Sequence, residues 1–141
     1  MSGAFDNTSD DGDSGYGYSG SRAKAIAAGR LYDVSELAKE AGFKWAVALT
    51  RNAWNECVKW SCEDSENQIF QSERIRLIEV LRVCAYTIRI EDPERSRMNF
   101  NMARIPRDGV STSATKLELQ IVAHLDDDEK PVLTILLPTA D

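Results

Sequence analysis

The chain has 141 residues, 43% of them hydrophobic, and a formal net charge of −6 at pH 7, a composition typical of a globular protein with one core. It contains no stretch of about 18 or more apolar residues, which excludes a membrane-spanning helix. Its first residues are acidic and polar, so we expect no secretory signal, and an odd number of cysteines (three) favours a reducing compartment. The sequence therefore predicts a cytoplasmic protein.

Residues 1–20 are dominated by Gly, Ser, Asp and Tyr and carry four aspartates but no Lys or Arg. Such a segment lacks the apolar side chains that offset the entropy of ordering a chain, so we expect a disordered acidic tail. Gly15, Gly17 and Gly20 match the dinucleotide-binding pattern G-x-G-x-x-G, but no buried strand precedes them and the match indicates no nucleotide site. Residues 21–141 are predicted to form a single domain.

The first part of this domain is predicted to be mainly helical. Residues 21–28 are rich in Ala and Lys, and Asp33 followed by Glu36 has the spacing of a capping box that begins a second helix. Residues 43–49 form a short apolar run, expected to be a buried strand, and Thr50 is expected to cap a third helix.

The longest helix is predicted over residues 70–87, after a polar loop at 61–68, and Pro93 follows its end. One stripe of apolar side chains at spacings of three and four is expected to face the core. It consists of Ile75, Ile78, Leu81, Ala85 and Ile88, widened by Leu77, Val80 and Cys84.

The last third of the chain alternates apolar and polar residues, as strands do. Runs at 98–102, 117–125 and 132–137 predict three strands in series with short connections, an antiparallel meander. The long helix is expected to lie on the apolar face of this sheet. The sequence therefore predicts an α+β domain in which three to four helices pack on a small, mainly antiparallel sheet of three to four strands.

No residue pattern predicts a metal, cofactor or catalytic centre. Cys57, Cys62 and Cys84 lack the paired spacing of zinc ligands, and the one histidine, His124, is expected on the exposed face of its strand. Because no nucleophile and base are paired in the sequence, we predict a protein that is not an enzyme and needs no cofactor. A small enzyme whose pocket assembles from distant residues is the alternative.

Two features are candidate protein-contact sites. Four consecutive carboxylates, Asp126, Asp127, Asp128 and Glu129, lie in a predicted hairpin turn and would attract a basic surface of another protein. Trp60, next to a polar loop, is a candidate interface anchor, although packing in or at the edge of the core is the commoner role of a tryptophan. The first hypothesis is therefore a non-catalytic protein that binds its partner through acidic surfaces.

Arginines on the predicted long helix support a second hypothesis. Arg74, Arg82 and Arg89 would contact phosphates if this helix face bound nucleic acid. The basic surplus around them is small, and the adjacent strand offers no aromatic platform outside the core, so a solvated face is favoured. A nucleic-acid-binding accessory factor is kept as the alternative.

Several separated segments resemble a known family. Residues 31–43 (LYDVSELAKEAGF), then 47–51 (VALTR), Trp54 and residues 129–138 (EKPVLTILLP) resemble an uncharacterised domain family of small acidic bacterial proteins encoded on plasmids, integrative elements and phages. The resemblance covers residues 18–141 and transfers no site residue. It implies an accessory protein of a mobile genetic element that binds a host or element-encoded protein complex, and inhibition of a host defence complex is one concrete version.

Overall fold

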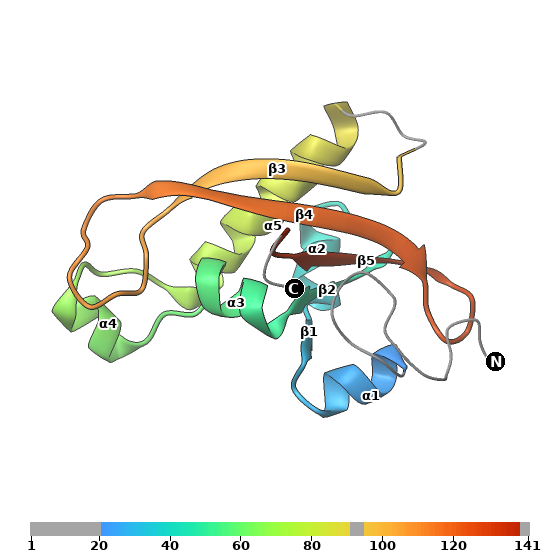
Figure 1. Ribbon diagram of the computed structural model, residues 1–141, viewed down its shortest axis with the longest axis horizontal. Coiled ribbons are helices and arrows are strands. Elements are labelled where there is room, and N and C mark those ends of the chain that lie inside the picture. Colours follow the sequence, from blue (N-terminus) through green and yellow to red (C-terminus); the bar gives the residue numbers. More distant parts are fainter. Residues whose placement is uncertain (1–20, 91–94, 139–141) are drawn as a thin grey trace.

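The described part of the chain is organised around a five-stranded sheet (Figure 1). In the computed structural model, which describes residues 21–90 and 95–138, the strands lie in the order β1-β2-β5-β4-β3. They are β1 (Leu31–Asp33), β2 (Ala46–Thr50), β3 (Arg97–Arg104), β4 (Thr115–Leu125) and β5 (Pro131–Leu136). The tail expected at residues 1–20 lies outside the described residues.

The last three strands form the predicted antiparallel meander, in which Phe100 of β3 faces Leu119 of β4 and Ile121 of β4 faces Ile135 of β5. β5 also pairs in parallel with β2, where Ile135 lies beside Leu49. β1 adds an antiparallel edge next to β2. The α+β class and the mainly antiparallel pairing are confirmed. The expected three to four strands are too few, because a three-residue strand is too short to show an alternating pattern and depends on its pairing with β2.

Helices cover both faces of the sheet (Figure 1). They are α1 (Arg22–Ala27), α2 (Ser35–Glu40), α3 (Arg51–Cys57), α4 (Cys62–Asn67) and α5 (Glu73–Ile90). Side chains of α2, α3 and α5 pack on one face, where the main core lies, as expected for the long helix. α1 packs on the other face, where Ala25 contacts Leu31 and Ala48.

Capping residues set the helix boundaries. Thr50 caps α3 as predicted, with its hydroxyl accepting a backbone N–H of the helix at 3.1 Å. Gly42 follows α2 with a φ of 101°, a conformation that glycine adopts without strain. The predicted capping box at the start of α2 is wrong, because the N-cap residue is Val34 and no side chain caps the helix. Asp33 lies one residue before the N-cap and accepts the N–H of Ser35 at 3.0 Å.

The predicted loop at 61–68 is wrong as well, because these residues contain α4. The helix begins with a capping box in which the Ser61 hydroxyl accepts the N–H of Asp64 at 3.1 Å and the Asp64 carboxylate accepts the N–H of Ser61 at 2.7 Å. α4 is short and polar, so it lacks the apolar periodicity by which the longer helices are recognised. Its capping box is the sequence signal that identifies it.

The buried side of α5 differs from the predicted stripe. Its members are Arg76, Leu77, Val80, Leu81, Cys84 and Thr87. Ile75, expected in the core, is 55% exposed, and the inward position beside it belongs to Arg76. Leu77, Val80 and Cys84, expected only to widen the stripe, therefore lie at the centre of the buried side. Relative to the predicted stripe, the buried side is shifted around the helix and includes Arg76.

Arg76 is 1% exposed and uses its guanidinium to join separate parts of the fold. Its Nε donates to the carbonyl of Val58 at 3.0 Å, and its Nη1 donates to the carbonyl of Ile105 at 3.3 Å and to Oε1 of Gln71 at 3.1 Å. The ring centroid of Trp60 lies 4.7 Å from the guanidinium carbon, within the range of a cation–π contact. Burial lowers the pKa of Arg76 to about 10, with a contribution from nearby Arg104, so it stays charged at pH 7.

Arg104, at the end of β3, adds a second buried guanidinium. It donates to the carbonyl of Cys57 at 2.9 Å and to that of Arg76 at 3.3 Å, and it forms an ion pair with Glu79. Buried carbonyl oxygens without partners are costly, and these two arginines satisfy those at the end of α3 and after β3. They therefore fix α3, α5 and the end of β3 relative to one another.

We expect Arg76→Met to reduce the free energy of unfolding by roughly 2–4 kcal/mol, because methionine keeps an apolar stem but leaves the carbonyls of Val58 and Ile105 unpaired. Urea unfolding at pH 7 measures the effect. Arg82→Met, the same change at an exposed position of α5, should alter it by no more than about 0.5 kcal/mol. Equal stability of the two variants would contradict the structural role of Arg76.

Candidate functional site

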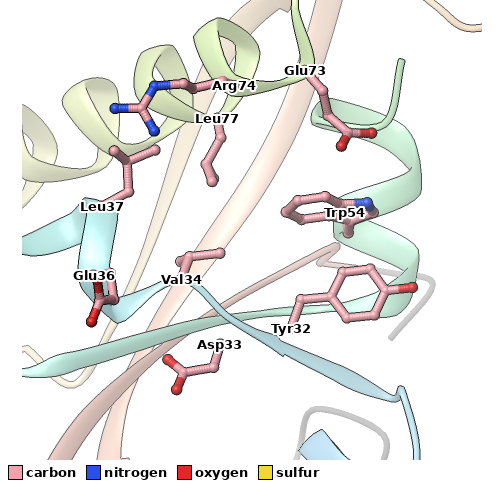
Figure 2. Close-up of a pocket in the computed structure, with 9 residues that line it drawn as sticks. All are labelled: Tyr32, Asp33, Val34, Glu36, Leu37, Trp54, Glu73, Arg74 and Leu77. Carbon is pink, nitrogen blue, oxygen red and sulfur yellow. The ribbon is translucent and has the colours of Figure 1, made fainter. Parts of the chain in front are cut away.

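A pocket of about 460 Å³ opens between β1, α2, α3 and the beginning of α5 (Figure 2). Its floor is apolar and consists of Val34, Leu37 and Leu77, which belong to the main core or pack against it. A pocket of this size accommodates a small molecule or a projecting side chain of another protein. All of its lining residues except Val34 belong to helices or a strand, so the pocket is part of the packed framework.

Two aromatic side chains form one wall of the pocket. Tyr32 of β1 and Trp54 of α3 meet edge to face, with their ring centroids 4.9 Å apart and their planes at 79°. The pairing of β1 with β2 places Tyr32 opposite Leu49, and the cap at Thr50 starts the helix that carries Trp54. Both rings are half-buried, so part of each is accessible from the pocket.

Carboxylates from three elements surround the pocket: Asp33, Glu36 and Glu73 are all exposed lining residues. Glu73 is oriented by the backbone, because its Oε2 accepts the N–H of Trp60 at 3.2 Å. Asp33 uses Oδ1 to accept from both the N–H and the hydroxyl of Ser35, at 3.0 and 2.6 Å. Two of the three carboxylates are therefore held in place, and Figure 2 shows Asp33 pointing away from Trp54 and Leu77.

Arg74 is the cationic lining residue, and it lies at the far side of the pocket from the aromatic wall. Its Nη2 is 3.9 Å from a carboxylate oxygen of Glu40 on α2, an exposed pair. Figure 2 shows its guanidinium pointing away from Trp54. Three carboxylates against one guanidinium that already has an anionic neighbour make the pocket electronegative.

The lining residues comprise no Cys, His, Lys, Ser or Thr. They offer aromatic surface, an apolar floor and fixed negative charge, but no nucleophile paired with a base. The described residues also contain no group of three or more His, Cys, Asp or Glu placed to hold a metal ion.

Trp60 is not the exposed anchor that the sequence suggested, because it is only 5% exposed. Its ring packs on Arg76, and its Nε1 donates to the hydroxyl of Ser65 at 3.1 Å. Ser65 lies on α4, the helix that was expected to be a loop. Packing in or at the edge of the core, the commoner role of a tryptophan, is therefore confirmed for Trp60, and its use as an exposed anchor is not.

The acidic turn lies between β4 and β5, beside α1, and does not line the pocket. Asp126 accepts two backbone N–H groups of the turn at 2.9 Å, and Asp127 accepts the N–H of Arg22 at 3.4 Å. Asp128 and Glu129 are exposed. Two of the four predicted contact residues therefore have structural partners, and the other two present their carboxylates to solvent.

The arginines proposed for nucleic acid do not form one surface. Arg82 and Arg89 are seven residues apart on α5 and both are exposed, whereas Arg74 pairs with Glu40 of α2. The guanidinium carbon of Arg89 lies 6.0 Å from the ring centroid of Tyr86. The structure thus brings two of the three together on the outer side of the helix.

The cysteines lie in contrasting environments. Cys57 and Cys84 are fully buried, and burial raises the pKa of the Cys57 thiol to about 12 and that of Cys84 even further. Such thiols stay protonated and behave as small apolar side chains. Cys62 is exposed at the start of α4.

His124 lies on the predicted face of β4, but the expectation that it is exposed is wrong. Its Nε2 is 2.8 Å from the hydroxyl oxygen of Thr134, which also accepts from Nη1 of Arg22 at 3.0 Å. The imidazole is half-buried because it contacts Thr134 on the neighbouring strand β5, and Arg22 of α1 bonds to the same hydroxyl. Burial, with the positive charge of Arg22, lowers the pKa of His124 to about 4.

The sequence analysis missed the pocket residues Tyr32, Trp54 and Glu73 as a group. Helical periodicity places Trp54 on the apolar stripe of its helix and singles out no role for Glu73, so it does not bring the two together. The available signal was the aromatic–acidic pair at Tyr32 and Asp33. It becomes informative only once β1 is known to lie beside the ends of α3 and α5.

Comparison of the chain with family models, curated proteins and solved structures gives no match in any of the three. The resemblance noted at 31–43 and 129–138 therefore stays a prediction, and the site is argued from its own geometry. In the described ranges, no helix has the length and apolar character needed to cross a membrane.

The lowered pKa of His124 predicts that the free energy of unfolding decreases as the pH is lowered. Below pH 6.5, the usual pKa of histidine, the unfolded chain binds a proton at His124 that the folded protein accepts only near pH 4. The free energy of unfolding should therefore be unaffected by His124 above about pH 7 and drop by roughly 1 kcal/mol at about pH 5.5. Because the chain has one histidine, His124→Gln should remove this dependence in urea unfolding. An NMR titration that gave His124 a pKa of 6.5 or more would contradict it.

Proposed function

We propose that the protein is a non-catalytic protein-binding module that holds a side chain of its partner in the pocket between β1, α2, α3 and α5. The observation that supports this most is the pocket itself, which combines about 460 Å³ of space, an aromatic wall and a rim of carboxylates. Interfaces gain most of their energy where a projecting group fills a well-formed pocket, and aromatic side chains are enriched at such places.

The construction of the pocket on packed elements favours binding by contact. Trp54 belongs to α3 and Glu73 to α5, and the hydrogen bonds of Arg76 and Arg104 connect these helices through the end of α3. A site built on packed elements needs little ordering when its ligand arrives, so more of the contact energy is available for affinity.

The family resemblance in the sequence makes a host or element-encoded protein complex the class of partner, and interference with a host defence complex is its concrete version. The net charge of −6 and the exposed carboxylates of Asp128 and Glu129 would steer a basic partner toward the protein. This steering weakens as salt screens the charges.

A nucleic-acid-binding accessory factor is the second candidate, favoured by Arg82 and Arg89 beside the exposed Tyr86 on α5. The small-enzyme alternative has less support. The hydroxyl of Thr134 and the imidazole of His124 resemble a nucleophile and base, but Thr134 is 0% exposed and its oxygen would not meet a substrate.

The test is capture of partner proteins from a lysate of the producing bacterium with the full chain, followed by mass spectrometry. We expect a defined set of proteins to bind at low salt and to be lost with Trp54→Leu, which removes the aromatic wall. Trp45→Leu is the matched control, because Trp45 is 46% exposed and does not line the pocket. Circular dichroism and thermal unfolding confirm that each variant is folded.

Identical protein sets for Trp54→Leu and the wild type would contradict the proposal, as would the absence of any captured protein at low salt. Recovery of DNA or RNA that is lost with Arg82→Gln and Arg89→Gln, but kept with Trp54→Leu, would favour the second candidate instead.

A further inference from the structure

We infer that the ligand of the pocket is the guanidinium group of an arginine side chain that projects from the partner protein. The inference rests on the proposed function and adds the chemistry of the group that is recognised. It is carried by the juxtaposition of an aromatic pair, an apolar floor and three carboxylates in one pocket.

The charge of the lining selects a cation. Asp33, Glu36 and Glu73 line the pocket, and the positive charge of Arg74 lies within 3.9 Å of Glu40 on the opposite side from the rings. An anion would meet net repulsion here. A purely apolar side chain would cover the carboxylates without offering them a hydrogen-bond donor, which is costly. A cationic group compensates the carboxylates that it covers.

The shape of the pocket suits a long cationic side chain. Val34, Leu37 and Leu77 give an apolar floor for methylene groups, and the lining also includes the carboxylates of Asp33, Glu36 and Glu73. Figure 2 shows the Glu73 carboxylate on one side of the Trp54 ring and Tyr32 on the other, so a charged head group at this wall would meet both ring and carboxylate. Arginine and lysine side chains bury their stems on apolar surfaces in this way.

Arginine fits this wall better than lysine. Its guanidinium is planar, stacks on aromatic rings, is less strongly hydrated than an ammonium group and bonds a carboxylate through two N–H groups. The fold already contains such a contact, since the guanidinium carbon of Arg76 lies 4.7 Å from the ring centroid of Trp60. The pocket offers the same pairing at the surface, where another chain can supply the arginine.

The test uses fragments of the side chain and the full ¹⁵N-labelled protein. n-Butylguanidinium, n-butylammonium and the neutral n-butylurea are titrated separately, and chemical-shift changes are followed at the Trp54 indole N–H and the amides of Tyr32 and Leu77. We expect saturable changes at these three sites with millimolar affinity, tightest for n-butylguanidinium and weakest for n-butylurea. Affinity should fall as NaCl is raised to about 0.5 M.

Glu73→Gln should weaken n-butylguanidinium binding roughly two- to fivefold. The double variant Glu36→Gln and Glu73→Gln should weaken it further. Glutamine at position 73 retains an acceptor for the N–H of Trp60, so the fold should be preserved. Glu118→Gln is the matched control, because Glu118 is exposed on β4 and does not line the pocket. It should leave the affinity unchanged.

Equal affinity for n-butylurea and n-butylguanidinium would overturn the inference, because charge would then be irrelevant. Tighter binding of n-butylammonium would overturn the choice of arginine. If captured proteins depend on Trp54 but n-butylguanidinium neither shifts the pocket residues nor displaces those proteins, the inference fails while the proposed function stands. If no protein depends on Trp54 yet n-butylguanidinium binds as expected, the proposed function fails instead.

Discussion

The guanidinium of Arg76 is the contact on which the arrangement of helices over the sheet depends. It is buried beneath Trp60 and donates to backbone carbonyls that follow α3 and β3. Burying a cation is costly unless hydrogen bonds and ring contacts offset the lost hydration, and here several do. Because the bonded carbonyls belong to separate segments, the arginine fixes the distance between α3 and α5. The pocket lies between these helices and β1.

The groups that line the pocket favour binding over catalysis. The most chemically suggestive pair in the described residues is the buried Thr134 and the half-buried His124, on the other face of the sheet. The pocket is lined by the rings of Tyr32 and Trp54 and the carboxylate of Glu73, groups that would contact a ligand there. In the proposed function, the acidity of the chain would have two roles, steering a basic partner from a distance and pairing with its cation on arrival.

Features that are encoded locally could be predicted from the sequence, and features that depend on tertiary contacts could not. The meander, the long helix and the cap at Thr50 follow from periodicity and from single residues. β1 depends on its pairing with β2, which no local pattern reveals. The buried face of α5 could not be predicted because hydrophobicity patterns do not place an arginine such as Arg76 in a core. The pocket combines both kinds of feature, since Tyr32 and Trp54 come together only after β1 and α3 are placed.

The central claim is that a guanidinium group is held against the aromatic wall of this pocket. Intermolecular nuclear Overhauser effects between the methylene protons of n-butylguanidinium and the protein measure that proximity directly. We expect contacts to the ring protons of Trp54 and Tyr32 and to the methyl groups of Leu77. Contacts confined to another exposed aromatic residue, such as Trp45, or none at a saturating concentration of the ligand, would contradict it.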